Sequence, residues 1–151
     1  QERLRYLKAL SERFNVDLYT GSDTSSMPLI HNCGFAKTNT EMPIIFNQSK
    51  ININLTAKSI RSGLSLRIFD VLGCEGFLIT NYQAELPEHF NIGEDLEAYT
   101  SLDDLIGKCE YYLSHDKERR EIAHNGFEKV KKYHTYDIRL TQMLEIAFGL
   151  K

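Results

Sequence analysis

The stretch Ser62–Asn81, SGLSLRIFDVLGCEGFLITN, determines the fold expected for this chain. It begins with a loop over Ser62–Ser65, continues as an apolar helix over Leu66–Leu72 that closes at Gly73, and ends in the apolar run Gly76–Thr80. Such a continuous apolar run is typical of a strand that is covered on both faces, as in parallel sheets. A loop, a helix and a buried strand in this order predict an α/β domain.

The segments on either side continue this alternation of strands and helices. Apolar periodicity of 3.6 marks the helices, and short apolar or alternating runs mark the strands. The expected helices are 2–14, 42–48, 102–114, 117–132 and 136–148, and the expected strands are 16–20, 29–33, 51–55 and 97–100. Together they predict a Rossmann-like parallel sheet flanked by helices, followed by a helical C-terminal tail.

Composition and charge exclude several classes of protein. The chain has 151 residues, 42% of them hydrophobic and 26% charged, which fits one globular domain. A formal net charge of -3 without a basic stripe argues against nucleic-acid binding. No signal peptide precedes the first helix and no apolar run approaches the ~18 residues of a membrane span, so we expect no span and a cytoplasmic location.

The cysteines and histidines give no metal-binding pattern. Cys33, Cys74 and Cys109 lie far apart and form neither a CxxC motif nor a Cys/His cluster along the chain. We therefore expect reduced, unpaired thiols and no metal. The five histidines, His31 and His134 among them, are expected to be structural or surface residues rather than catalysts.

The loop before residue 66 is the most informative candidate for a ligand site. A glycine-containing loop that opens a helix presents free backbone N–H groups and the positive end of the helix dipole, which attract phosphate. Arg67 lies in the first turn of the helix and Asp70 one turn later, where a carboxylate can accept hydrogen bonds from a ribose diol. The alternative is an ordinary helix start with a surface ion pair between Arg67 and Asp70.

A second candidate lies where the strand of residues 76–80 ends. Thr80, Asn81 and Tyr82 stand at the edge where open α/β sheets bind ligands. The alternative is a turn whose side chains satisfy nearby backbone groups.

Residues Ile51–Glu85 and His115–Tyr136 carry the most specific part of a resemblance that covers nearly the whole chain. The sequence is similar to bacterial glycosyltransferases related to the CgeB-type spore maturation protein, within the GT-B architecture. That superfamily has a Gly-rich turn and helix with two spaced acidic residues, followed by a buried strand. Here the turn is Ser62–Leu64 and Asp70 stands at the second acidic position, whereas the first acidic residue is missing near Ser62.

The resemblance implies a donor-binding domain, which holds a nucleotide-diphosphate sugar whose sugar is transferred to an acceptor hydroxyl. The donor-binding residues that it implies are Gly63, Leu64, Ser65, Arg67, Asp70, Lys37, Asn39, Thr80 and Asn81. The amides of residues 63–65 would face the diphosphate, Arg67 would neutralise it and Asp70 would receive the ribose. Lys37 and Asn39 would contact the base. No DxD motif occurs, so donor binding is expected to need neither metal nor cofactor.

The resemblance also implies parts that lie outside this chain. The sequence enters the first helix directly after Gln1, whereas a strand at the centre of the sheet and an N-terminal acceptor domain are expected before it. We therefore expect residues 1–151 to be one domain of a longer enzyme and to be inactive alone. The sheet would lack a central strand, close differently, or borrow an edge from another copy in a homo-oligomer.

Two other functions stay open at this point. A degenerate glycosyltransferase domain used only for binding or assembly would explain the missing first acidic residue. A receiver-type regulatory module would need acidic residues at the ends of its first and third strands. Asp17 instead lies inside its strand, and Asn52 and Asn54 stand where acids would help.

Overall fold

The computed structural model describes residues 2–56 and 63–149, so Ser62 at the start of the predicted loop lies outside them. The elements are α1 (Glu2–Ser11), β1 (Val16–Leu18), β2 (Ile30–Asn32), α2 (Met42–Gln48), β3 (Asn52–Asn54), α3 (Leu66–Gly73), β4 (Leu78–Asn81), α4 (Leu86–His89), β5 (Glu97–Tyr99), α5 (Leu102–Ser114), α6 (Asp116–Tyr133) and α7 (Tyr136–Ala147). The predicted fold class, parallel strands flanked by helices with a helical C-terminal tail, is confirmed.

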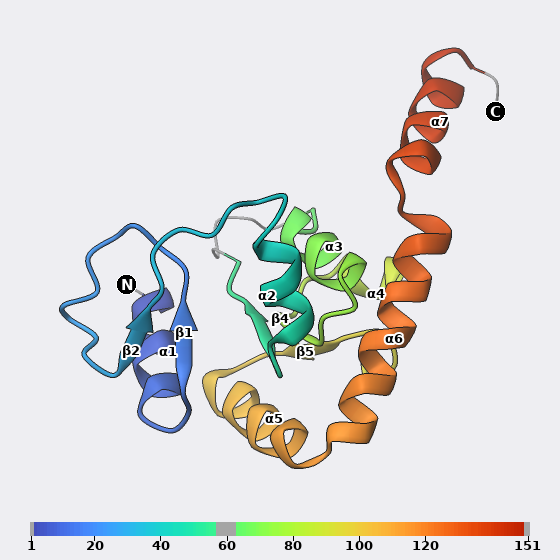
Figure 1. Ribbon diagram of the computed structural model, residues 1–151. Coiled ribbons are helices and arrows are strands. Elements are labelled where there is room, and N and C mark those ends of the chain that lie inside the picture. The colour runs from blue at the N-terminus through green and yellow to red at the C-terminus, as the bar shows by residue number, and fades with distance from the viewer. Residues whose placement is uncertain (1, 57–62, 150–151) are drawn as a thin grey trace.

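The strands form two parallel sheets instead of the single sheet expected. β1 pairs with β2, and β3, β4 and β5 pair in that order in a second sheet. The β1–β2 pair lies with α1 to one side of the body that contains β3, β4 and β5 (Figure 1). Within residues 2–56 and 63–149, β1 pairs only with β2 and β3 only with β4, so each of them has one unpaired edge.

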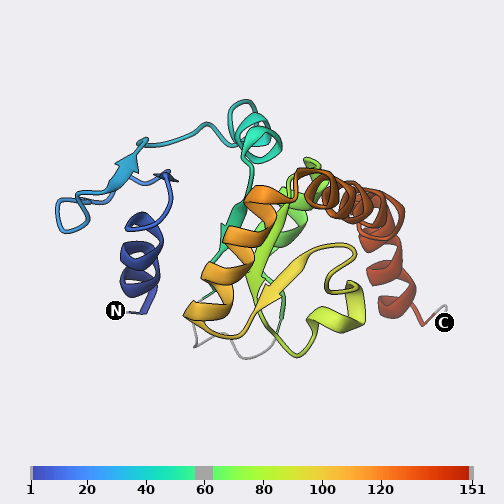
Figure 2. The same ribbon diagram turned by 90° about the horizontal axis from the view of Figure 1, so that it is seen from below.

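The three-stranded sheet is covered on both faces, as the apolar run predicted. Phe77 and Ile79 enter a core to which α1 and α5 contribute, including Leu105. Leu78, between them in sequence, enters the opposite core together with Ile68 of α3. Successive side chains of a strand point to opposite faces, so helices α3 and α5 lie on opposite sides of the sheet (Figure 2).

The C-terminal end of α3 differs from the expected closure at Gly73. Gly73 is helical, and the residue in the left-handed region is Glu75, with a φ of 57°. The amides of Glu75 and Gly76 donate to carbonyls of the last helical turn, each at 3.0 Å, which is a Schellman motif. Glycine is needed at position 76, because a Cβ there would lie 2.6 Å from the carbonyl oxygen of Phe46.

Two other helices depart from the sequence prediction. α1 ends at Ser11 instead of residue 14, and its buried side chains are Tyr6 and Leu10, whereas Leu4 is exposed. α4 was not predicted, because four residues are too few to show helical periodicity and its second residue is Pro87.

The C-terminal helix α7 extends away from the rest of the molecule (Figure 1). None of its side chains is buried, and Tyr136, Met143 and Ile146 are among its exposed apolar residues. In the described part of the chain, no helix combines the length and the apolar character that crossing a bilayer requires.

Candidate functional site

The carboxyl ends of β3, β4 and β5 meet at one edge of the larger sheet, because the three strands are parallel. A cavity of about 590 Å³ lies at this edge. It is lined by residues 55–56, 81–84 and 99–102, which follow or end the three strands, and by the first turns of α1. Small-molecule sites commonly have volumes of about 300–1,000 Å³, and open α/β sheets bind ligands at this edge.

Two arginines of α1 line the cavity. Arg3 donates from Nη2 to the carbonyl oxygen of Leu55 at 2.8 Å. The guanidinium carbon of Arg5 lies 5.6 Å from the centre of the Tyr6 ring. They are not among the residues predicted from the sequence, because an amphipathic pattern does not tell which loops a helix terminus will approach. They bring positive charge to the carboxyl edge of the sheet.

Tyr99, at the end of β5, supplies a hydroxyl beside the cavity. The hydroxyl group donates a hydrogen bond to the carbonyl oxygen of Asn54 at 3.4 Å. Burial, with smaller contributions from Tyr6 and Glu2, raises the pKa of Tyr99. The side chain therefore stays a neutral phenol at physiological pH.

The two predicted residues at the end of β4 take different positions. Asn81 lines the cavity, and its Oδ1 accepts a hydrogen bond from the backbone amide of Thr56 at 2.9 Å. Thr80 is fully buried, and its Oγ1 accepts from Nδ2 of Asn54 at 3.0 Å. Asn81 thus borders the cavity, whereas Thr80 holds neighbouring strands together. Tyr82, the third residue of this group, also lines the cavity and is about half exposed.

The Gly63 turn is attached to the border of the cavity. Gly63 has a φ of +85°, and its carbonyl accepts a hydrogen bond at 3.1 Å from Nε2 of Gln83, which lines the cavity. The Gly63 amide, predicted to face phosphate, donates to Oε1 of Glu85 at 2.8 Å. The Gly63 N–H is therefore already hydrogen-bonded to a carboxylate oxygen. Oε1 of Gln83 is buried and has no hydrogen-bond partner among the described residues.

The start of α3 is capped by its own residues. Ser65 is the N-cap, and its hydroxyl oxygen accepts from the backbone amide of Arg67 at 3.3 Å. Leu64 packs against the core that contains Ile68.

Arg67 and Asp70 pair with each other. Nη1 of Arg67 lies 3.5 Å from Oδ2 of Asp70, and the two side chains are 44% and 54% exposed. The guanidinium also lies 5.4 Å from the centre of the Phe46 ring and contacts the sulfur of Met42 at 3.7 Å. This arrangement is the surface ion pair that the sequence left open as the alternative, and neither side chain lines the cavity.

The two residues predicted to contact a base lie on the exposed connection from β2 to α2. Nζ of Lys37 lies 3.8 Å from Oε1 of Glu41, and the Lys37 amide donates to the same carboxylate at 2.9 Å. Asn39 is exposed in the following turn. Neither residue lines the cavity. The connection reaches α3 through the contact between Met42 and Arg67.

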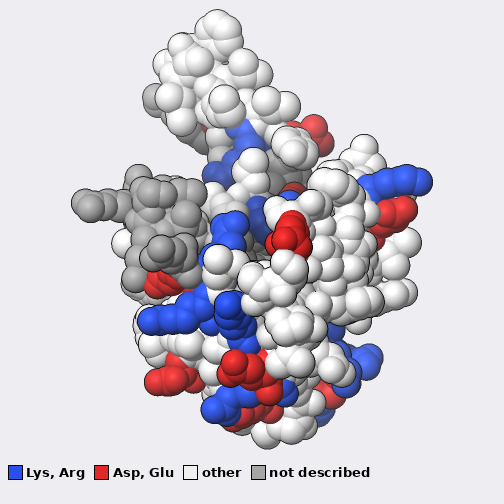
Figure 3. Space-filling model, turned by 90° about the vertical axis from the view of Figure 1, so that its left-hand side faces the viewer, with Lys and Arg blue, Asp and Glu red and all other residues white. Residues whose placement is uncertain are grey.

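Buried carboxylates near the larger sheet are neutralised by lysines. Glu97 of β5 pairs with Lys108, and its other oxygen accepts from the hydroxyl of Tyr112 at 3.0 Å. Asp95 lies 2.6 Å from Nζ of Lys129. These pairs stabilise the fold and are not free acids. On the surface, the face seen in Figure 3 carries Lys and Arg as well as Asp and Glu side chains.

Comparison with known proteins identifies a protein family. The model of a protein family described as "Glycosyl transferase-like" matches residues 3–145. No curated protein matches the chain. The matched range includes Gly63, all of α3 and every residue that lines the cavity except Glu2.

Proposed function

The chain belongs to the glycosyl transferase-like family, and we propose that it is the donor-binding domain of a glycosyltransferase of GT-B architecture, similar to the CgeB-type enzymes. The longer protein would transfer a sugar from a nucleotide-diphosphate sugar to an acceptor hydroxyl. Residues 1–151 form one domain of that protein in this proposal, and the acceptor would be bound by a separate N-terminal domain.

The observation that supports this proposal best is the cavity of about 590 Å³ at the carboxyl edge of β3, β4 and β5. It lies where parallel α/β sheets bind nucleotides. Arg3 and Arg5 line it, and Gly63, just before α3, is hydrogen-bonded to Gln83 of its lining. Arginine and backbone N–H groups are the usual partners of a diphosphate.

We assign the diphosphate to the border between the cavity and the start of α3. The amides of residues 63–65 and the guanidinium of Arg67 would hold it, with Arg3 as a further cation. The pair between Arg67 and Asp70 is half exposed, and exposed pairs contribute only about 0–1 kcal/mol, so a phosphate can compete for the guanidinium. Glu85 must leave the Gly63 amide before a phosphate binds there.

The remaining predicted contacts follow from this placement. Asp70 would receive the ribose hydroxyls, and Lys37 and Asn39 would contact the base. Asn81 would border the ligand, and Thr80 would support Asn54 from inside the sheet. Arginines and the helix dipole would stabilise the negative charge that builds on the leaving diphosphate, so that no metal is needed.

Titration of the isotope-labelled chain with UDP and GDP tests this proposal. We expect shifts of the amide signals of residues 63–70, 34–42 and 81–84, with or without EDTA. Arg67→Ala should weaken binding about tenfold or more, because a charge-assisted hydrogen bond is lost. Lys131→Ala is the control, since Lys131 is exposed on α6 and pairs with Glu128.

Glu85→Gln gives the opposite expectation. Glutamine keeps an acceptor oxygen but loses the charge, so it competes less strongly for the Gly63 amide and no longer repels phosphate, and the nucleotide should bind more tightly. If neither nucleotide shifts these signals, the donor site is elsewhere or the domain is a degenerate one used for assembly. If Arg67→Ala and Lys131→Ala lose the same amount of nucleotide affinity, Arg67 is not part of the donor site.

A further inference from the structure

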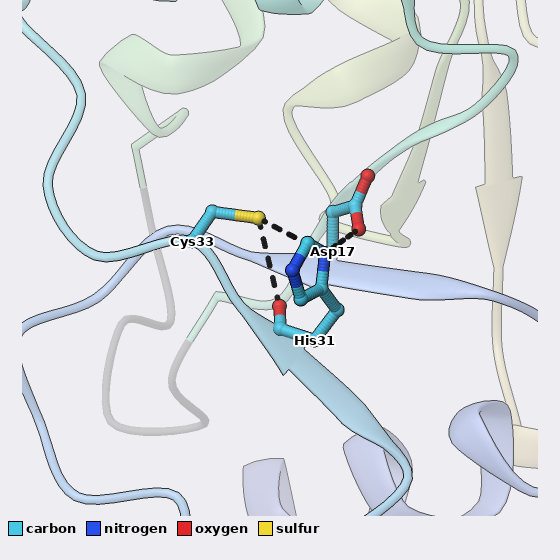
Figure 4. Close-up of side chains that lie close together, drawn as sticks. All are labelled: Asp17, His31 and Cys33. Atoms are coloured by element: carbon cyan, nitrogen blue, oxygen red, sulfur yellow. Dashed lines mark hydrogen bonds and ion pairs between the residues drawn. The ribbon is translucent and has the colours of Figure 1, made fainter.

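The smaller sheet carries three potential metal ligands on one face. The strand register places Asp17 of β1 opposite His31 of β2, and Cys33 follows His31 by two residues. The Cys33 amide donates to the carbonyl of Leu18 at 3.0 Å, so the ladder extends to this residue. Residues two apart on a strand share a face, and the three side chains point toward one another (Figure 4).

The distances within this group are close to those between the ligand atoms of a tetrahedral ion. Oδ1 of Asp17 lies 2.9 Å and Sγ of Cys33 lies 3.6 Å from Nδ1 of His31. The three ligand atoms all lie within 4.8 Å of one another. Metal bonds of about 2.0–2.3 Å place tetrahedral ligand atoms roughly 3.3–3.6 Å apart, so small rotations of these exposed side chains would suffice.

We propose that Asp17, His31 and Cys33 form a zinc-binding site. A thiolate, an imidazole nitrogen and a carboxylate suit this borderline-soft ion, and the thiolate and carboxylate together supply the two negative charges that a divalent ion needs. On binding, the Cys33 thiol releases its proton to solvent, and the imidazole carries its single proton on Nε2 so that Nδ1 can bind the metal. Water completes the coordination.

A proton relay of the Cys-His-Asp kind does not fit this group. Such a relay needs the nucleophile and the carboxylate on different ring nitrogens. Here both Cys33 and Asp17 approach Nδ1 of His31. A metal at the position of the Nδ1 proton satisfies both contacts at once.

The surroundings hold the ligands in place and leave access for an ion. Nδ2 of Asn32 donates to the carbonyl of Ser22 at 3.3 Å, and Oδ1 accepts from the Gly34 amide at 2.9 Å, so the backbone on either side of Cys33 is fixed. The His31 and Asp17 side chains are 76% and 63% exposed. A bound ion would join β1 to β2, whose pairing covers only three residues on each strand.

This site shares no residue with the proposed donor site. Asp17, His31 and Cys33 do not line the cavity at the carboxyl edge of the larger sheet. Donor binding without a metal and zinc binding at β1 and β2 can therefore both hold, and each has its own test.

Titration of the reduced, metal-free chain with Co²⁺ tests the zinc site. We expect one ion per chain and a near-ultraviolet thiolate-to-cobalt charge-transfer band that one equivalent of Zn²⁺ abolishes. Cys33→Ser should lose the band, and Asp17→Asn and His31→Gln should weaken binding about tenfold or more. Cys74→Ser is the matched control, since Cys74 lies outside the group and should keep the band.

Alkylation gives a second readout that does not depend on a variant. Zn²⁺ should slow the reaction of Cys33 with iodoacetamide at least tenfold and leave Cys74 unchanged, as read by peptide mass spectrometry. A charge-transfer band that persists in Cys33→Ser, or equal alkylation of Cys33 with and without Zn²⁺, would overturn the proposal. The circular dichroism of each variant confirms that it is folded.

Discussion

Gly126 of α6 lies where this helix closely approaches the backbone at Asp95. A Cβ at this position would lie 2.2 Å from the carbonyl oxygen of Asp95 and 2.8 Å from a methyl carbon of Leu72. The leucine can rotate, but the backbone at Asp95 is fixed. Its carboxylate lies 2.6 Å from Nζ of Lys129 and accepts from the amide of Asn91 at 2.7 Å. Gly126→Ala must therefore push α6 away from the segment before β5.

Two opposing effects determine how much Gly126→Ala changes the free energy of unfolding. Alanine is favoured over glycine inside a helix by about 1 kcal/mol. Forcing a methyl group into a packed position costs about 1–3 kcal/mol or more, and here the overlap with a carbonyl oxygen exceeds 1 Å. We expect Gly126→Ala to lower the free energy of unfolding by about 2 kcal/mol, and Tm by roughly 4–8 °C.

Gly107 is the matched control, because it lies inside α5 and a Cβ there meets nothing within 4 Å. Gly107→Ala should raise the free energy of unfolding by up to about 1 kcal/mol. Urea unfolding followed by circular dichroism measures both variants, with an unchanged m-value as the condition for comparison. If Gly126→Ala unfolds at or above the wild-type midpoint, the close approach between α6 and Asp95 is wrong.

Substitutions of Glu75, His134 and the Lys108–Glu97 pair test other parts of the fold by urea unfolding. Glu75→Gly should raise stability by about 0.5 kcal/mol, because glycine tolerates the φ of 57°, whereas Glu75→Ala should give no gain. Burial lowers the pKa of His134 to about 4, below its ordinary 6.5, so the neutral form is favoured in the fold. The stability that depends on a neutral His134 is fully present above pH 6.5 and is lost as the pH falls toward 4. His134→Phe should therefore reduce the drop in the free energy of unfolding between pH 7 and pH 5. An unchanged drop contradicts this. Lys108→Met should cost about 2 kcal/mol by leaving Glu97 buried without its cation, and the double variant with Glu97→Gln should recover part of that loss; no recovery would mean that the pair is not the cause.

Local patterns predicted most elements of the fold but not how they pair. The helices at 42–48 and 102–114 have the predicted bounds, and the apolar run ending at Thr80 does enter cores on both faces. The separation of β1 and β2 from the other strands was not predictable, because a sequence pattern identifies a strand without its partner. Strands of three or four residues also carry little information on register.

The candidate site was predictable where it depends on strand ends. Asn81 lies at the cavity because it ends a parallel strand, and the same rule covers the residues after β3 and β5. The bond from Gly63 to Glu85 joins residues far apart in sequence, and the approach of Arg3 to Leu55 depends on how α1 packs. The burial of Thr80 depends on which face of the strand it occupies. None of these three is a local property.

The division of the strands into two sheets predicts the order in which parts of the molecule unfold. In the described residues no backbone ladder crosses from β1 to β3. The N-terminal unit, formed by α1, β1 and β2, contacts the larger sheet through side chains, such as Tyr6 against Tyr99 with ring centres 5.8 Å apart. Segments that share few backbone hydrogen bonds open as separate cooperative units. The amides of β1 and β2 should therefore exchange with deuterium well before those of β4, so that the molecule loses its N-terminal unit while its larger sheet is still intact.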